Sequence, residues 1–194
     1  MLFRSNEENA ITTNGMSLSK RDAKYGNAAF IVPVEPSDYV SVKNTEKYEV
    51  LAGISFQRSI EEKAFNAGGK DFSVPALKLK DYLYNKVSAD LPENRSCPRS
   101  VPASFDEILP DFINKTLRHQ IPNMLKELDE VSSDEAIVYA AETRSSSPVR
   151  VLRDNNCESL NIKGLYPIGE GAGYAGGIVS SAVDGMKAAE SILF

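Results

Sequence analysis

The chain has 194 residues, enough for one sizeable hydrophobic core or for one domain with a small satellite. Its composition is that of a globular protein, and its net charge of −5 argues against a nucleic-acid-binding surface. No apolar run reaches the roughly 18 residues that predict a membrane-spanning helix, and the start of the chain has no apolar signal segment. We therefore expect a cytoplasmic protein.

The first half of the chain predicts one strand followed by helices. The apolar stretch 28–35 predicts a strand, and Pro33 within it predicts an edge position. Apolar residues spaced three or four apart predict a helix over 56–67, which the Gly68-Gly69 pair should end. A second helix is predicted over 76–86.

The helical block continues beyond a proline-rich connection at 88–102. Ser104 begins the pattern Ser-Phe-Asp-Glu, which predicts a capping box and a helix start. Pro110 and Pro122 should divide the residues that follow into separate helical pieces. The predicted block therefore covers about 54–131.

The closing third changes character. The stretches 135–143, 148–154 and 162–170 predict short strands, and 177–193 predicts a strong helix. The expected architecture is α+β, with mixed or antiparallel strands, a helical insert and a C-terminal strand–loop–helix. Cys97 and Cys157 lie too far apart for a Cys-x-x-Cys pair, and the single histidine has no second ligand spaced near it. We predict no metal site.

Before the last helix, residues 171–176 fit the dinucleotide-binding pattern G-x-G-x-x-G. That fingerprint needs a second strand that ends in an acid about 20 residues further on. Only 18 residues follow Gly176, and Asp184 and Glu190 lie inside the predicted helix. As a complete ADP-binding motif the pattern fails.

The glycines still permit a close approach of backbone to a ligand, and the unpaired N–H groups of the helix that follows favour negative charge. Glu170 stands among them, where a carboxylate can accept hydrogen bonds from the hydroxyls of a polyol or sugar. The alternative interpretation is a glycine-rich turn in front of a packing helix.

Residues 164–192, "GLYPIGEGAGYAGGIVSSAVDGMKAAESI", resemble the C-terminal flavin segment of FAD-dependent dehydrogenases of the class with two dinucleotide-binding domains. The similarity is closest to the large bacterial FAD-dependent dehydrogenases. Further stretches match in the family's order: Thr13–Ser17, Arg21 with Asn27-Ala28, Leu51–Phe65 and Glu142–Arg150.

The resemblance implies that this segment holds the ribityl-flavin half of FAD. Gly169-Glu170 matches the family's glycine–acid pair, and Tyr174 to Ile178 would approach the pyrimidine edge of the flavin. Arg144 and Tyr174 are candidates to face the substrate or flavin, Arg150 is a weaker one, and surface ion pairs are the alternative for the arginines. The candidate cofactor-binding residues are Asn14, Ser17, Gly169, Glu170, Gly171, Ala172, Gly173, Tyr174, Ala175, Gly176, Gly177 and Ile178.

The resemblance also implies a substrate or cap domain over 1–140 and, over 141–194, a segment that completes an FAD-binding domain. The family's N-terminal Rossmann unit, which holds ADP, is not found in these residues, so we expect the C-terminal portion of an oxidoreductase that transfers hydride through flavin. Alone it should be inactive, bind FAD weakly or not at all, and pair as a homodimer through exposed apolar surface. NAD(P)H is a candidate reductant, and the sequence does not decide whether it reduces the flavin.

The alternative function is a non-catalytic module that kept the flavoprotein fold to bind a ligand or a partner. A hydrolase ranks third, because Ser145–Ser147 lack the G-x-S-x-G elbow of such enzymes.

Overall fold

The computed structural model describes residues 2–4, 7–16, 19–20, 22, 25–39, 49–93, 96–127 and 135–193. The chain forms two units, and each combines two separate stretches of sequence. The first unit consists of Met1–Glu35 and Gln57–Thr143, and the second consists of Pro36–Phe56 and Arg144–Phe194.

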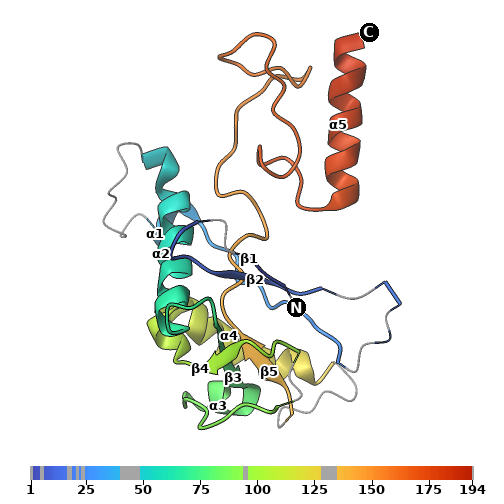
Figure 1. The fold of residues 1–194 in the computed structure, drawn as a ribbon. Coiled ribbons are helices and arrows are strands. Elements are labelled where there is room, and N and C mark those ends of the chain that lie inside the picture. Colours follow the sequence, from blue (N-terminus) through green and yellow to red (C-terminus); the bar gives the residue numbers. More distant parts are fainter. Residues whose placement is uncertain are drawn as a thin grey trace. The chain divides into compact units, whose positions relative to one another are not determined.

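Two small sheets form the framework of the first unit (Figure 1). Strands β1 (Leu2–Arg4) and β2 (Thr12–Asn14) pair antiparallel. In the other sheet, β3 (Val74–Lys78) lies between β4 (Ser100–Pro102) and β5 (Ile137–Tyr139). β3 runs parallel to β4 and antiparallel to β5, so the sheet is mixed and its central strand is almost completely buried.

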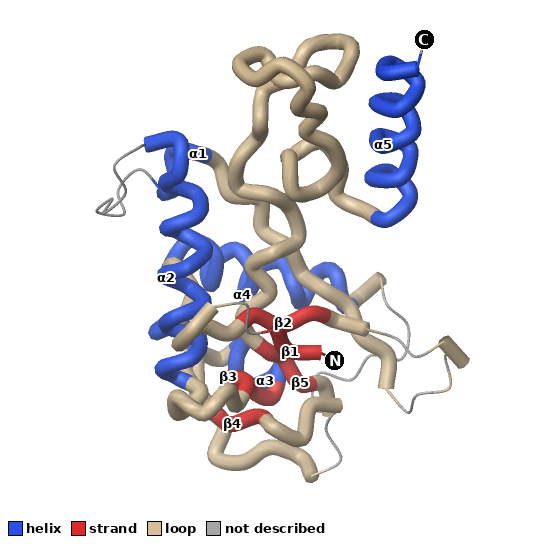
Figure 2. The backbone as a smooth tube through the Cα atoms, turned by 45° about the horizontal axis from the view of Figure 1, so that its top comes forward, coloured by secondary structure: helices blue, strands red, loops and turns tan. Residues whose placement is uncertain are grey.

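Helices complete both units. In the first unit, α3 (Leu79–Leu83) follows β3 directly, and a 3-10 turn, η2 (Phe105–Glu107), precedes α4 (Asp111–Leu125). Helix α2 (Ala52–Ala67) begins in the second unit and continues into the first. The remaining helices, all in the second unit, are α1 (Pro36–Tyr39), the 3-10 turn η1 (Glu49–Leu51) and α5 (Ile178–Leu193). Figure 2 shows how much of the second unit is loop.

Tyr82 on α3 organises the core of the first unit. Its ring lies 5.3 Å from that of Phe105, and its hydroxyl donates a hydrogen bond of 3.1 Å to the side chain of Asn114 on α4. The amide of Asn114, itself fully buried, donates to the Phe105 carbonyl at 3.0 Å. Burial raises the pKa of Tyr82 to about 12. These bonds join α3, η2 and α4. They also give the buried Tyr82 hydroxyl and Asn114 amide the hydrogen-bond partners that buried polar groups need.

A second buried network fastens the start of the chain to the rest of the first unit. Glu61 on α2 is 1% exposed, and the Thr143 hydroxyl donates to its carboxylate at 2.5 Å. The Thr12 hydroxyl on β2 lies 3.1 Å from that of Thr143 and 3.1 Å from the Ala141 carbonyl, to which it donates. Backbone N–H groups add bonds from Ile11 to Glu61 and from Thr13 to Ala141. Thus β2, α2 and the segment after β5 are held together.

The predicted α+β class is confirmed. So are the helix that ends at Gly68-Gly69, the strand within 135–143 and the last helix, found as α2, β5 and α5. Gly68 donates its N–H to the Ala64 carbonyl at 2.9 Å, and Gly69 has a φ of +91°, so the glycine pair stops α2 as expected.

Three of the predicted strands are wrong. Residues 28–35 and 162–170 contain no strand, and 148–154 contain only an isolated bridge between Arg153 and Ser159. The reason is the same in each case: an apolar, extended segment becomes a strand only if another strand pairs with it. Residues 28–35 are at most half-buried, and Pro33 has no N–H to donate.

The middle of the chain brings three corrections. The predicted helix over 76–86 is β3 at its start and helical only as α3, because a central strand covered on both faces has a continuous apolar run that imitates a buried helix. Ser104 does precede η2, yet its side chain makes no capping hydrogen bond. Pro122 does not divide α4, which continues to Leu125 while the neighbouring Ile121 stays buried. Pro110 does mark the start of α4.

Candidate functional site

The candidate site is the glycine loop, residues 169–177, which leads into α5 in the second unit. The loop folds back on itself: Gly173 donates its N–H to the Glu170 carbonyl at 2.9 Å, and Tyr174 donates to the Gly169 carbonyl at 3.0 Å. Gly169 and Gly173 have φ values of +70° and +83°, in the left-handed region that favours glycine. Two of the loop's glycines are therefore required by its own backbone.

The extended segment 147–153 lies against this loop. Val151 donates its N–H to the Ala172 carbonyl at 3.1 Å, and the Arg150 guanidinium donates to the Gly173 carbonyl at 3.0 Å. The Ser147 hydroxyl lies within 3.3 Å of the Gly171 carbonyl. Several of the loop's carbonyl groups thus accept hydrogen bonds from this segment, and these bonds fix the backbone conformation of the loop.

A nearly buried ion pair joins Arg153, in the segment beside the loop, to Asp184 on α5. Arg153 binds the carboxylate of Asp184 with two hydrogen bonds, of 2.6 and 2.9 Å, and the two side chains are only 11% and 12% exposed. Asp184 also accepts the N–H of Gly169 at 2.9 Å, and Arg153 donates to the Pro167 carbonyl at 2.8 Å. Such bidentate pairs fix direction as well as distance. We call these two residues the loop clamp.

The clamp changes the acidity of its carboxylate. The hydrogen bond from Arg153, followed by that from the Gly169 N–H, lowers the pKa of Asp184 from 3.8 to about 2. The same contact with Asp184 raises the pKa of Arg153, which stays a cation. The pair is therefore ionised at every pH above the acid range.

This pKa predicts an acid-dependent loss of stability. Because the folded-state pKa lies below the unfolded value, the contribution of Asp184 is complete above about pH 4 and disappears as the pH falls through about 2. We expect Asp184→Asn to remove about 1–2 kcal/mol at neutral pH and almost nothing near pH 2. Urea unfolding of both proteins at several pH values measures the difference, and a pH-independent difference would contradict the prediction.

Tyr174 has a structural position inside this arrangement. Its ring centroid lies 3.6 Å from the Arg153 guanidinium and 5.1 Å from that of Arg150, and its hydroxyl donates to the Val151 carbonyl at 3.0 Å. The stacked cations and the engaged hydroxyl hold the ring in place. A role of Tyr174 toward a substrate or flavin stays a prediction.

Other loop residues face open space. A Cβ added at Gly171 or Gly176 would meet no atom within 4 Å, and neither residue has a positive φ. The Glu170 side chain is exposed, as are Ile178 and Val179 at the start of α5. There the Ser180 hydroxyl accepts the N–H of Gly177 at 3.1 Å. The open side of the loop thus presents backbone, one carboxylate and a helix N-terminus.

The remaining candidates lie elsewhere or outside the described residues. Asn14 is exposed at the end of β2 in the first unit, and its contact with the cofactor stays a prediction. Arg144 begins the second unit and is half-buried. Ser17 lies outside the described residues. Next to Arg144, burial raises the pKa of Glu142, opposed by a hydrogen bond from the Gly15 backbone.

The sequence alone does not reveal the clamp. It offers Asp184 only as a ribose-binding acid, a role that its place inside the helix excludes, and it places Arg153 in a predicted strand. The available signal was a single acid in the middle of a helix that is otherwise apolar or small around it, from Val179 to Met186. A carboxylate in such surroundings needs a cation to pair with.

Within the part of the chain that the structure covers, no three His, Cys, Asp or Glu side chains come together as metal ligands. In that same part, none of the helices combines the length and the apolar character needed to cross a bilayer.

A family model and a relative match this chain, the relative along nearly its whole length. The family model described as FAD-dependent protein, C-terminal domain-like, matches residues 2–145. An alignment with an uncharacterized protein of Clostridium beijerinckii extends over 194 residues with 39% identity. The matched part makes up 97% of this chain and 35% of that relative. The chain thus spans about a third of the length of this relative. It belongs to the family described as FAD-dependent protein, C-terminal domain-like.

Proposed function

We propose that this chain is the C-terminal part of an FAD-dependent oxidoreductase and that its glycine loop, with the start of α5, holds the ribityl-flavin half of FAD. Family membership supports the flavoprotein part of the proposal. When bound, the flavin supplies the hydride-transfer chemistry, and NAD(P)H is the proposed reductant.

The observation that carries the proposal is the pair of open glycines, Gly171 and Gly176. Neither has a positive φ, and a Cβ at either would touch nothing in the chain. The fold of the loop therefore does not require glycine at these two positions. A ligand that must approach the backbone closely does require it, and FAD sites use glycine in this way.

The chemistry around these glycines fits the flavin end of the cofactor. Glu170, exposed beside Gly171, can accept hydrogen bonds from ribityl hydroxyls. The first turn of α5, a helix of 16 residues, favours negative charge, which a flavin gains at its pyrimidine edge on reduction. The arginines of the neighbouring segment, Arg150 and Arg153, are engaged with the Gly173 carbonyl and with Asp184. Binding and orientation are thus the roles proposed for the chain's own residues.

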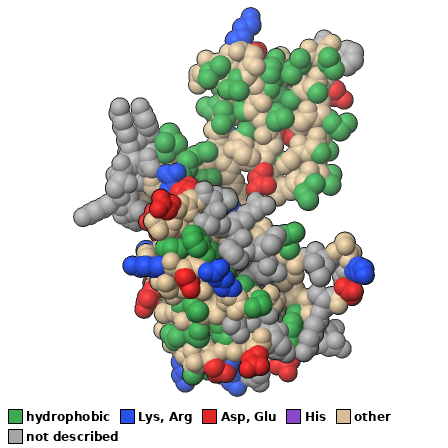
Figure 3. All heavy atoms as spheres, in the orientation of Figure 1, with side chains coloured by type: hydrophobic (Ala, Val, Ile, Leu, Met, Phe, Trp, Pro, Cys, Tyr) green, Lys and Arg blue, Asp and Glu red, His purple; other side chains and the backbone are tan. Residues whose placement is uncertain are grey.

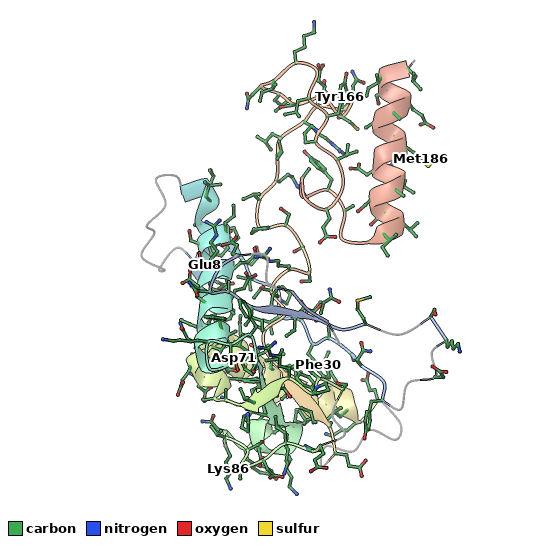
Figure 4. The ribbon with its side chains drawn as sticks, viewed as in Figure 1. Glu8, Phe30, Asp71, Lys86, Tyr166 and Met186 are labelled. Atoms are coloured by element: carbon green, nitrogen blue, oxygen red, sulfur yellow. The ribbon has the colours of Figure 1, made fainter. Side chains whose placement is uncertain are left out.

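The surface of α5 supports a further partner, the remainder of the flavoprotein. Its apolar side chains are widely exposed, and Figure 3 shows apolar side chains gathered over this part of the second unit. Met186, labelled in Figure 4, projects outward from the helix and is 63% exposed. The residues concerned are Ile178, Val179, Val183, Met186, Ile192 and Leu193. Since the relative is much longer than this chain, we propose that its additional domain covers α5.

Alanine at the open glycines tests the proposal. In the protein expressed from its complete reading frame, we expect Gly171→Ala and Gly176→Ala to keep the melting temperature within about 2 °C while weakening FAD binding by roughly tenfold or more. The added methyl meets no atom of the chain within 4 Å, so in the proposed site only the cofactor would be affected. Flavin absorbance per protein and titration of the apoprotein with FAD give the measurement.

Gly26→Ala is the matched control, since a Cβ there also meets nothing within 4 Å and the residue lies in the first unit. It should bind FAD like the wild type. A wild-type protein without flavin, or loop variants with unchanged affinity, would count against the proposed site. The first of these outcomes would favour the non-catalytic module.

A further inference from the structure

We propose that the loop clamp, Arg153 and Asp184, positions the flavin end of the site: it sets the place of Gly169-Glu170 relative to α5 without touching the cofactor. This inference rests on the proposed function. The clamp links α5 to Gly169, to the Pro167 carbonyl just before the loop and to the ring of Tyr174.

One carboxylate serves three segments of the chain. Asp184 is the seventh residue of α5, and its two oxygens accept two bonds from Arg153 and one from the N–H of Gly169. A carboxylate that accepts charge-assisted bonds from a planar guanidinium has little freedom to rotate. The N–H of Gly169 is therefore held at a fixed place over the helix.

Arg153 fixes the loop from the other side. Its guanidinium donates to the Pro167 carbonyl, just before the loop, and lies over the ring of Tyr174, in the second half of the loop. One side chain, that of Arg153, therefore contacts the chain just before the turn from Gly169 to Tyr174 and again at the end of that turn. A Lys at this position keeps the charge but cannot make the same planar set of contacts.

The clamp acts on the cofactor site by placing Glu170 and does not contact the cofactor itself. Arg153 and Asp184 are nearly buried and their polar atoms bond one another and the backbone, whereas the neighbouring Glu170 is exposed. The direction of the Glu170 side chain follows from the backbone of Gly169, whose φ of +70° is kept by the bond to Asp184. Binding groups lose affinity when such supporting contacts are lost, since misplacement by about 1 Å is enough.

The test uses Asp184→Asn and Arg153→Lys in the protein expressed from its complete reading frame. Asp90→Asn is the matched control, because Asp90 also pairs with a cation, Lys78, at 2.8 Å but is 75% exposed in the first unit. Hydrogen exchange of peptides that cover 166–177, FAD affinity and the flavin midpoint potential are measured for each protein. Arg153→Lys retains the charge in case the Asn variant fails to fold.

We expect both clamp variants to exchange hydrogen faster over 166–177, to bind FAD roughly tenfold more weakly and to show a shifted flavin potential, with Asp90→Asn unchanged. Faster exchange with unchanged affinity and potential would mean a purely structural pair and would overturn the inference. Unchanged exchange would also overturn it. If the wild-type protein binds no flavin, the proposed function itself fails, and the positioning role fails with it.

Discussion

Gly173→Ala should disrupt the glycine loop and destabilise the second unit by about 3 kcal/mol. A Cβ at this position would lie 2.6 Å from the Val149 carbonyl oxygen and 3.0 Å from the Arg150 Cα, both backbone atoms that have no side-chain freedom with which to move away. The φ of +83° adds strain for any residue other than glycine. Urea unfolding followed by circular dichroism gives the change in the free energy of unfolding.

Gly171→Ala, in the same loop, is the matched control for this prediction. It introduces the same methyl group where nothing lies within 4 Å, so its free energy of unfolding should stay within about 0.5 kcal/mol of the wild type. Equal stability of the two variants would show that the packing of 149–150 on the loop is wrong.

Gly68→Ala should be the most destabilising glycine-to-alanine substitution in the first unit. We expect it to lower the free energy of unfolding by about 4 kcal/mol. The added Cβ would stand 2.0 Å from the Ser73 carbonyl oxygen and 3.2 Å from that of Ala64. Ser73 leads directly into β3, the central strand of the sheet, so relief of the clash must displace the strand or the end of α2. Thermal and urea unfolding report the loss.

The comparison for this variant is Gly26→Ala, where the new Cβ has open space around it. We expect its melting temperature to match that of the wild type. A Gly68→Ala protein as stable as the control would mean that the end of α2 does not approach Ser73 as described.

The helices could be predicted where a local pattern decides them. The stripe of Phe56, Ile60 and Ala64 predicted α2, because these side chains repeat at the helical period and all three are buried. β3 could not be told from a helix, since its residues are buried on both faces and show no alternation. Strand pairing depends on a partner far away in the sequence, which is why 28–35 and 148–154 were misjudged.

The candidate site also has one part that the sequence predicts and one part that it does not. Its glycines could be found because a dense run of glycine before a helix is a local feature, and Gly169 and Gly173 do need their unusual φ values. The clamp could not be found because Arg153 and Asp184 are separated by 31 residues and neither belongs to a repeating pattern. Only a folded loop brings the guanidinium, the Gly169 N–H and the carboxylate to one point.

The bonds between β2 and the segment after β5 have a consequence for the order of folding. The Thr12 hydroxyl reaches the Ala141 carbonyl across a separation of 129 residues, and the Thr13 N–H donates to the same carbonyl. During synthesis, β2 cannot acquire these bonds until residues near 141 have left the ribosome. Closing so large a loop costs entropy before any contact repays it, so we expect β2 to be among the last strands of the first unit to be secured.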